Sequence, residues 1–115
     1  LHTPLNDATR GLIGAQTLAR MKSTAIIVNT GRGPVVNEAA LYEGLRDGAI
    51  AGAGLDVFES EPLAADSPLL KLDNIVVTPH IAGTTLDTWT RRLDFAFGNF
   101  QRVDCGADAA FLIPG

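Results

Sequence analysis

The chain has 115 residues, of which 46% are hydrophobic and 19% are charged, a balance typical of a folded domain rather than a disordered segment. Nine basic and 13 acidic residues give a net charge of −4 without any basic run, which argues against nucleic acid as a partner. No apolar stretch approaches the roughly 20 residues that cross a bilayer. The single cysteine, Cys105, has no partner for an internal disulfide and fits no metal-ligand spacing, so we expect a cytoplasmic protein without a metal site.

Apolar runs separated by polar, glycine and proline residues predict six elements of secondary structure along the chain. They are a helix, a strand, a helix, two strands and a last helix, over residues 14–21, 25–29, 38–47, 50–57, 75–77 and from Thr84 or Thr85 onward. The first strand does not alternate between apolar and polar residues, which is typical of a strand buried on both faces of a parallel sheet. Asn37 can cap the second helix and Gly48 can end it.

The glycines of the second strand and the apolar residues of the last helix predict close packing. Gly52 and Gly54 thin that strand, which indicates that another part of the chain lies close to their backbone. In the last helix, apolar residues recur at helical spacing and are expected to face a core: Leu86, Trp89, Leu93, Phe97, Phe100 and Val103. Strands that alternate with helices in this way predict an α/β fold built from parallel βαβ units.

Polar residues with chemical potential follow each predicted strand. Arg32 follows the first strand in a glycine-rich turn, Asp56, Glu59 and Glu61 follow the second, and His80 follows the third after Thr-Pro. Open parallel sheets bind ligands at the carboxyl ends of their strands. Taken singly, these residues are ordinary turn, surface or packing residues, but their joint arrival at three successive strand ends favours a functional site.

The three types of side chain suit one reaction. An arginine can hold a carboxylate through two parallel hydrogen bonds. A histidine can give a proton to a carbonyl oxygen or take one from a hydroxyl, and a carboxylate can support it. This is the equipment for redox chemistry on a 2-oxo or 2-hydroxy acid. It includes no hydride source, so a nicotinamide cofactor is expected to supply one.

Several stretches of the sequence resemble one known family. They are HTPL (residues 2–5), MK (21–22), NTGRG (29–33), GAGLDVF (52–58), EP (61–62) and TPHIAG (78–83). In this order they are similar to the D-isomer-specific 2-hydroxyacid dehydrogenases, a group that includes phosphoglycerate dehydrogenase, glyoxylate/hydroxypyruvate reductase, D-lactate dehydrogenase and formate dehydrogenase. The resemblance runs from Leu1 to about Gly83 and is weaker along the last helix.

The resemblance implies a role for each matching residue. Arg32 would bind the substrate carboxylate, His80 would be the general acid and base, and Glu61, rather than Glu59, would be its partner. Asp56 would hold the nicotinamide carboxamide, and Pro4 and the Thr78-Pro79 turn would shape the pocket. Other residues would lie along the cofactor, which is NAD, with NADP left open: Thr3, Thr30, Gly31 and Gly83. A small 2-hydroxy or 2-oxo acid is the implied partner, and a homodimer is the implied assembly.

Two parts of the family pattern are missing. The chain has no G-x-G-x-x-G turn followed by an acidic residue, and it has no separate substrate domain. We therefore expect the second half of a Rossmann-like doubly wound sheet over residues 1–83. Residues 84–115 would form an exit helix and tail that lead towards the substrate domain. On this interpretation the chain is a fragment that is inactive alone, and it is marginally stable or associates, because half a sheet leaves an unpaired edge.

Two alternatives stay open at this point. Formate and phosphite oxidation occur in the same superfamily, and a panel of substrates separates them from 2-oxo acid reduction. The chain could also be a non-catalytic binding module that keeps the fold, as corepressors in this superfamily do. That interpretation is disfavoured because the chain has all three expected catalytic residues, Arg32, Glu61 and His80.

Overall fold

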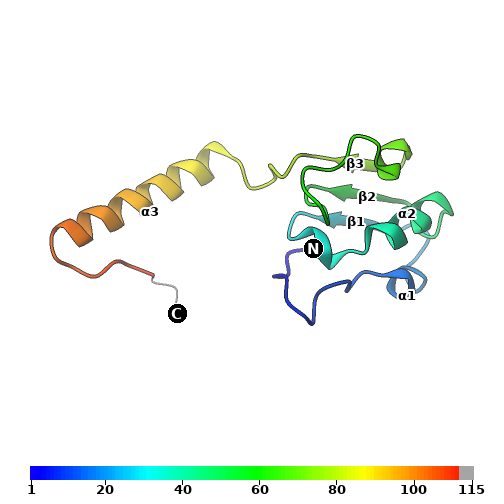
Figure 1. Cartoon of the computed structure of the whole chain (residues 1–115), viewed down its shortest axis with the longest axis horizontal. Helices are drawn as coiled ribbons and strands as arrows, with labels where there is room; N and C mark the ends of the chain where they lie inside the picture. The colour runs from blue at the N-terminus through cyan, green and yellow to red at the C-terminus, as the bar shows by residue number, and fades with distance from the viewer. Residues whose placement is uncertain (112–115) are drawn as a thin grey trace. The chain divides into compact units, whose positions relative to one another are not determined.

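The computed structural model describes residues 1–111, which form two compact units, Leu1–Ala82 and the residues from Gly83 onward. The first unit contains a parallel sheet in the order β1-β2-β3, formed by β1 (Ile26–Asn29), β2 (Gly52–Leu55) and β3 (Ile75–Val77) (Figure 1). All three predicted strands are confirmed. The register pairs Asn29 with Leu55 and Leu55 with Val77, so that the three strands end side by side.

Helices connect the strands only in part. Helix α1 (Ala15–Leu18) precedes β1 and is shorter than predicted, and α2 (Glu38–Arg46) connects β1 to β2 as predicted. A short 3-10 helix, η1 (Gly33–Val35), precedes α2. No α-helix lies between β2 and β3, where the structure has a loop and a second 3-10 helix, η2 (Pro68–Lys71).

One face of the sheet carries the core of the first unit. Ile27, Ala53 and Leu55 of the strands form one buried cluster with Leu18 of α1 and with Leu41 of α2. The opposite face is open within the described residues, because Ile26 and Val76 keep 70% and 69% of their surface exposed. The prediction that β1 is buried on both faces is therefore wrong for this structure. A run of apolar residues indicates that a strand can be covered on both sides, but the covering element has to come from elsewhere.

The predicted cap and stop of α2 are both confirmed. The Asn37 side-chain oxygen accepts a hydrogen bond from the Ala40 backbone N–H at 2.8 Å, and Gly48 follows the helix with φ of +72°, a conformation that favours glycine.

We expect Asn37→Ala to lower the free energy of unfolding by about 1 kcal/mol, because the Ala40 N–H would lose its acceptor. Urea denaturation of the two proteins measures this difference. Asn37→Asp is the matched control, since a carboxylate oxygen serves equally well as a cap, and its midpoint should stay near that of the parent. Equal midpoints for the Ala and Asp variants would contradict a role for the cap.

The two glycines of β2 differ in how closely they are approached. A side chain at Gly52 would meet the Asn74 carbonyl oxygen at 3.0 Å, as expected for a close backbone approach. At Gly54 a side chain would meet only Val28 at 3.8 Å, an ordinary contact, so the prediction is wrong there. Gly54 lies on the open face of the sheet, where its neighbours in register are Val28 and Val76.

The second unit is built on α3 (Leu86–Asp104), a helix of 19 residues. The Thr85 hydroxyl caps it by accepting a hydrogen bond from the Thr88 N–H at 3.1 Å. The segment after the helix returns along it, where Asn99 exchanges two hydrogen bonds with Ala110 and the Phe95 ring lies 5.8 Å from that of Phe111. Among residues 1–111, no helix is long and apolar enough to span a membrane.

The expected core stripe of α3 is not buried in this structure. No residue of the helix is buried, and the predicted core residues are all exposed among the described part of the chain: Leu86, Trp89, Leu93, Phe97, Phe100 and Val103. The helical spacing correctly predicted one apolar side of the helix. It could not predict what covers that side.

Candidate functional site

The carboxyl ends of the three strands bring the predicted residues to one edge of the first unit. Arg32 lies in the turn after β1, Asp56 directly follows β2, Glu61 lies five residues further on, and His80 lies in the loop after β3. Backbone hydrogen bonds continue the register past the strands, because Asp56 N–H donates to the Asn29 carbonyl at 3.0 Å and Thr78 N–H donates to the Leu55 carbonyl at 2.9 Å.

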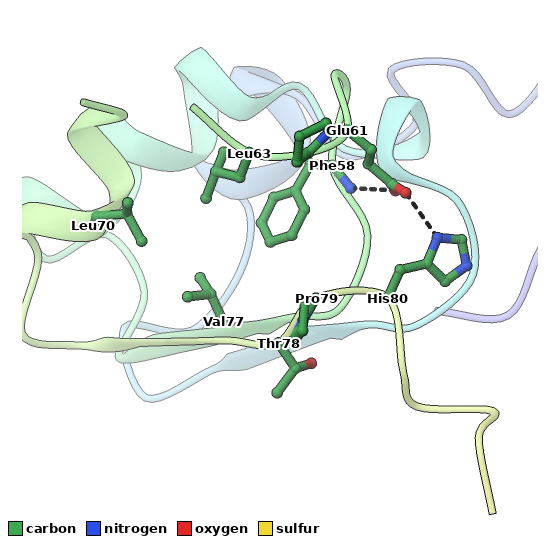
Figure 2. A pocket seen from close by; sticks show the side chains of 9 residues that line it. Phe58, Glu61, Leu63, Leu70, Val77, Thr78, Pro79 and His80 are labelled. Atoms are coloured by element: carbon green, nitrogen blue, oxygen red, sulfur yellow. Dashed lines mark hydrogen bonds and ion pairs between the residues drawn. The ribbon is translucent and has the colours of Figure 1, made fainter. Parts of the chain in front are cut away.

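Glu61 and His80 are in direct contact. Glu61 Oε2 lies 2.7 Å from Nδ1 of His80, and the other oxygen of Glu61 accepts a hydrogen bond from the Phe58 backbone N–H at 3.1 Å. Figure 2 shows the Glu61 carboxylate between these two donors, with the second nitrogen of the imidazole, Nε2, pointing away from Glu61. The side chain of His80 is 51% exposed, so that a ligand can reach this nitrogen.

The backbone of His80 is held in an unusual conformation. Its φ of 54° lies in the left-handed region, which costs a residue other than glycine about 1–2 kcal/mol. Such a conformation persists only where neighbouring contacts enforce it, and it is commonest at functional sites. Hydrogen bonds to Asp56 hold the residues on both sides of His80.

Asp56 is 3% exposed and binds the loop on both sides of His80. Its Oδ1 accepts hydrogen bonds from the Thr78 hydroxyl at 2.5 Å and from the Ile81 N–H at 2.8 Å, while Oδ2 accepts from the Ala82 N–H at 2.9 Å. Burial raises the pKa of Asp56, but these hydrogen bonds and the nearby His80 outweigh it, and the pKa lies below its ordinary value. Asp56 is therefore a carboxylate at neutral pH.

The pKa of Glu61 is also lowered. The hydrogen bond with His80 is the main cause, and the Phe58 N–H adds to it against the opposing effects of desolvation and of the Asp56 charge. Glu59 has a different partner, because it exchanges hydrogen bonds with Glu38 at the start of α2. Burial is the main cause that raises the pKa of Glu38. Glu61, and not Glu59, is thus the acid that contacts His80.

We expect the stability of the protein to fall in acid partly through Glu61. Its folded pKa lies below the ordinary value of 4.5, so the unfolded chain takes up the proton first as the pH falls. The contribution is present above the unfolded pKa and is lost as the pH falls through the folded pKa. It is small because the pair is partly exposed. Urea denaturation between about pH 7 and pH 3 should show a shallower loss for Glu61→Gln than for Glu59→Gln. Identical pH profiles would contradict this.

Arg32 is presented by a turn that Asn29 organises. Asn29 is fully buried, with 0% exposure; its side chain donates to the Arg32 carbonyl at 3.0 Å and accepts from the Gly31 N–H at 3.1 Å. The Arg32 guanidinium is exposed and donates to the Gly31 carbonyl at 2.8 Å. Among the described residues it forms no ion pair with Glu61. The structure therefore places Arg32 at the same edge as His80 without joining the two side chains.

Gly33 joins this turn to the segment after β2. A Cβ atom at Gly33 would lie 1.8 Å from the Phe58 carbonyl oxygen, so only glycine fits at this position. Phe58 is also the residue whose N–H binds Glu61. The backbone of the Arg32 turn and the backbone that carries Glu61 are thus in direct contact.

The first residues of the chain run beside the end of β1. The Leu1 nitrogen donates to the Val28 carbonyl, and a side chain at Gly31 would lie 3.2 Å from the Leu1 carbonyl oxygen. Thr30 Oγ1 lies 3.4 Å from His2 Nδ1. The Thr3 hydroxyl is buried and has no hydrogen-bond partner among residues 1–111. Pro4 is exposed, and its carbonyl accepts a hydrogen bond from the Thr9 hydroxyl at 2.7 Å.

One predicted site residue belongs to the other unit. Gly83 is the first residue of the second unit and is exposed. The other predicted site residues all lie in the first unit. Within the described range the structure has no cluster of three or more His, Cys, Asp or Glu residues that could hold a metal ion.

Glu61 and His80 also line a pocket of about 540 Å³. Figure 2 shows Phe58, Leu63, Leu70 and Val77 around it, with Glu61 and His80 at one end. Nε2 of His80 points away from the apolar side chains of this pocket.

Sequence reasoning assigned no role to Asn29 or to the Phe58 backbone. Asn29 had a usable signal, because an asparagine between an apolar run and a Thr-Gly pair often organises a turn through its side chain. Gly33 and Phe58 are 25 residues apart in the sequence, and no local sequence pattern predicts their contact.

Comparison with known proteins identifies the family. The family model for the NAD binding domain of D-isomer specific 2-hydroxyacid dehydrogenases matches residues 1–82. The chain is 52% identical over 99 residues to glyoxylate reductase of Korarchaeum cryptofilum, covering 86% of this chain and 30% of that protein. It is 56% identical over 85 residues to glyoxylate/hydroxypyruvate reductase B of Yersinia pestis, covering 74% of this chain and 26% of that protein. The chain therefore spans less than a third of the length of these relatives.

Solved structures agree with the sequence comparison. D-lactate dehydrogenase with NAD+ from Lactobacillus jensenii superposes with a TM-score of 0.90 at 31% identity, over 100% of this chain and 38% of that chain. A D-isomer specific 2-hydroxyacid dehydrogenase from Xanthobacter autotrophicus in complex with NADPH and MES gives 0.80 at 42% identity, over 98% and 46%. The predicted fold class, part of a Rossmann-like sheet with a trailing helix, is confirmed. The chain belongs to the D-isomer specific 2-hydroxyacid dehydrogenase family and matches its NAD-binding domain.

Proposed function

We propose that the protein carrying this chain is an NAD(P)-dependent oxidoreductase that interconverts D-2-hydroxy acids and 2-oxo acids. Its substrates would resemble those of glyoxylate/hydroxypyruvate reductase or of phosphoglycerate dehydrogenase. The observation that carries the proposal is the Glu61–His80 contact of 2.7 Å at the carboxyl ends of the parallel strands. Both relatives named above are reductases of small 2-oxo acids, which supports the same reaction class.

His80 supplies the proton in this reaction. Glu61 accepts a hydrogen bond from Nδ1, which fixes the tautomer and the orientation of the ring and leaves Nε2 to face the substrate. In reduction, Nε2 gives a proton to the carbonyl oxygen of the 2-oxo acid. In oxidation, the neutral Nε2 takes the proton of the hydroxyl group. Overall, a 2-oxo acid, a hydride and a proton give a 2-hydroxy acid.

Arg32 holds the carboxylate of the acid. A guanidinium has five N–H donors, and here one nitrogen, Nη1, is engaged with the Gly31 carbonyl. The remaining donors are available for two parallel hydrogen bonds to a carboxylate. The buried Asn29 side chain holds the turn while the guanidinium itself stays exposed, so the charge is presented from a fixed base.

The residues beside β1 and β2 suit a nicotinamide cofactor. Thr3 offers a buried hydroxyl that lacks a partner within the described part of the chain, and Thr30 and Gly31 lie at the same strand end. Asp56 has about one acceptor position left, because a carboxylate accepts about four hydrogen bonds and three are in use. These residues, with Pro4 and Gly83, would hold the cofactor. When bound, its reduced form supplies a hydride to the carbonyl carbon of the substrate.

A panel of 2-oxo acids tests the proposal. We would follow the oxidation of NADH and of NADPH by the complete protein with glyoxylate, hydroxypyruvate, pyruvate and phosphohydroxypyruvate, and the reverse reaction with both enantiomers of lactate and glycerate. Turnover restricted to the D-isomers is the expected result. Turnover of formate or phosphite alone would assign a different reaction. Cofactor binding without turnover of any of these compounds would favour a non-catalytic module.

The assembly and domain organisation belong to the same proposal. We propose that residues 84–115, of which the structure describes 84–111, lead from the cofactor domain towards a substrate domain, and that the complete protein is a cytoplasmic homodimer. Sedimentation analysis of the complete protein tests the dimer. A monomer at all concentrations would contradict it.

A further inference from the structure

Two buried polar side chains connect the turn that carries Arg32 to the loop that carries His80. We propose that Asn29 and Asp56 form one positioning unit that fixes these two segments relative to each other. The kinetic part of this inference rests on the proposed function, because it assumes that Arg32 and His80 act on the same substrate. The structural part does not, since it concerns only how the two segments are held.

The first half of the unit is Asn29. Its amide group bridges its own turn, donating to the carbonyl of Arg32 and accepting from the N–H of Gly31. The side chain is fully buried, so water cannot replace either bond. A side-chain amide offers a donor on its nitrogen and an acceptor on its oxygen, as this turn requires.

The second half of the unit is Asp56. Its carboxylate accepts three hydrogen bonds from residues on both sides of His80, namely the Thr78 hydroxyl and the backbone N–H groups of Ile81 and Ala82. A carboxylate only accepts hydrogen bonds, which suits a site with three donors. These bonds close the loop around the left-handed backbone of His80, whose ring then meets Glu61.

A single backbone hydrogen bond joins the two halves. The Asp56 N–H donates to the Asn29 carbonyl at 3.0 Å, where β1 and β2 end side by side. The path from the Arg32 carbonyl to the His80 loop therefore runs through Asn29 and Asp56 without a gap. A displacement of about 1 Å between catalytic groups can cost about 10²-fold in rate, so the rigidity of this path matters.

Kinetic measurements on the complete protein compare Asn29→Asp, Asp56→Asn and the double variant. Asn29→Asp replaces the donor to the Arg32 carbonyl by an acceptor, and Asp56→Asn places an amide donor among N–H groups, so each change disrupts one half. The control is Asn74→Asp. Asn74 makes the same kind of bond, from its amide to the Leu45 carbonyl at 3.1 Å, and it precedes β3 at the other end of the sheet.

Each single variant should lower kcat/KM for the 2-oxo acid by about 10- to 100-fold. The dissociation constant of the reduced cofactor should stay nearly unchanged in Asn29→Asp, whereas Asp56→Asn can also change it, because Asp56 is proposed to contact the nicotinamide. The double variant should lose less than the product of the two single losses, because the residues act as one unit. Asn74→Asp should keep the parent rate. Losses that multiply independently, or a loss confined to cofactor affinity, would overturn the proposal.

Amide hydrogen exchange tests the unit without any assay of activity. Asn29→Asp should accelerate exchange of the Ile81 and Ala82 N–H groups across the sheet, whereas Asn74→Asp should not. Thr78→Val, which removes one hydroxyl donor to Asp56, is a milder variant for the case that Asp56→Asn fails to fold, and it should accelerate exchange at Gly31. Coupled exchange in an inactive protein would reject the proposed function and keep the unit. Uncoupled exchange would overturn the unit.

Discussion

Replacement of His80 with glutamine is expected to lower kcat of the complete protein by about 10²–10⁴-fold. Glutamine keeps a polar side chain of similar reach but has no group that gives or takes a proton near neutral pH. The proposed role of the ring as acid and base rests on its contact with Glu61 at 2.7 Å. Steady-state rates with saturating cofactor and 2-oxo acid measure the effect, and the cofactor dissociation constant should change little.

Two acids of the same loop provide matched comparisons for His80. Glu61→Gln should also lower kcat, because the ring loses a charged partner while the contact with the Phe58 N–H can persist. Glu59→Gln should leave kcat near the parent value, since Glu59 contacts Glu38 and not His80. A His80→Gln protein with parental kcat would remove the imidazole from the proposed reaction.

Replacement of Gly33 with alanine is the second substitution with a large expected effect, here on folding. The added methyl group would overlap the Phe58 carbonyl, a backbone atom that cannot rotate away. Overpacking of a core usually costs about 1–3 kcal/mol, and we expect a loss of about 3 kcal/mol or more because backbone must move. The free energy of unfolding from urea titration measures this loss. Any folded Gly33→Ala protein should also have lower kcat/KM, since the Arg32 turn and the Glu61 segment separate.

Gly54→Ala is the control for Gly33. Both glycines lie in the first unit, but a methyl group at Gly54 would meet only the Val28 side chain at 3.8 Å. The stability of Gly54→Ala should therefore stay within about 1 kcal/mol of the parent. Equal effects of the two substitutions would show that the contact with Phe58 does not restrict position 33.

Local signals predicted the elements whose causes are local. Asn37 and Gly48 correctly predicted the two ends of α2, and the apolar run that ends at Asn29 correctly predicted β1. The carboxyl-end rule then placed Arg32 and His80 at one edge of the sheet, because parallel strands end on the same side. The Glu61–His80 contact itself depends on the course of the loop after β2, and only the family resemblance singled out Glu61 over Glu59 before the structure was known.

Tertiary contacts account for what the sequence did not predict. The three hydrogen bonds that Asp56 accepts come from residues more than 20 positions away, and a strand-end aspartate has no pattern that names them. The sequence correctly indicated which residues of β1 and α3 are apolar. Whether these side chains are buried also depends on a second surface that covers them. Ile26 and Phe97 remain exposed for that reason among the described residues.

Selection for thermal stability alone would act against His80. Glycine adopts a φ of 54° without strain, and asparagine tolerates it better than most residues, so either one at position 80 relieves backbone strain. The same change removes the imidazole. If His80 has the proposed role, stability and activity are in conflict at this position, and directed evolution for heat resistance with selection for activity should hold position 80 fixed while the rest of the loop varies.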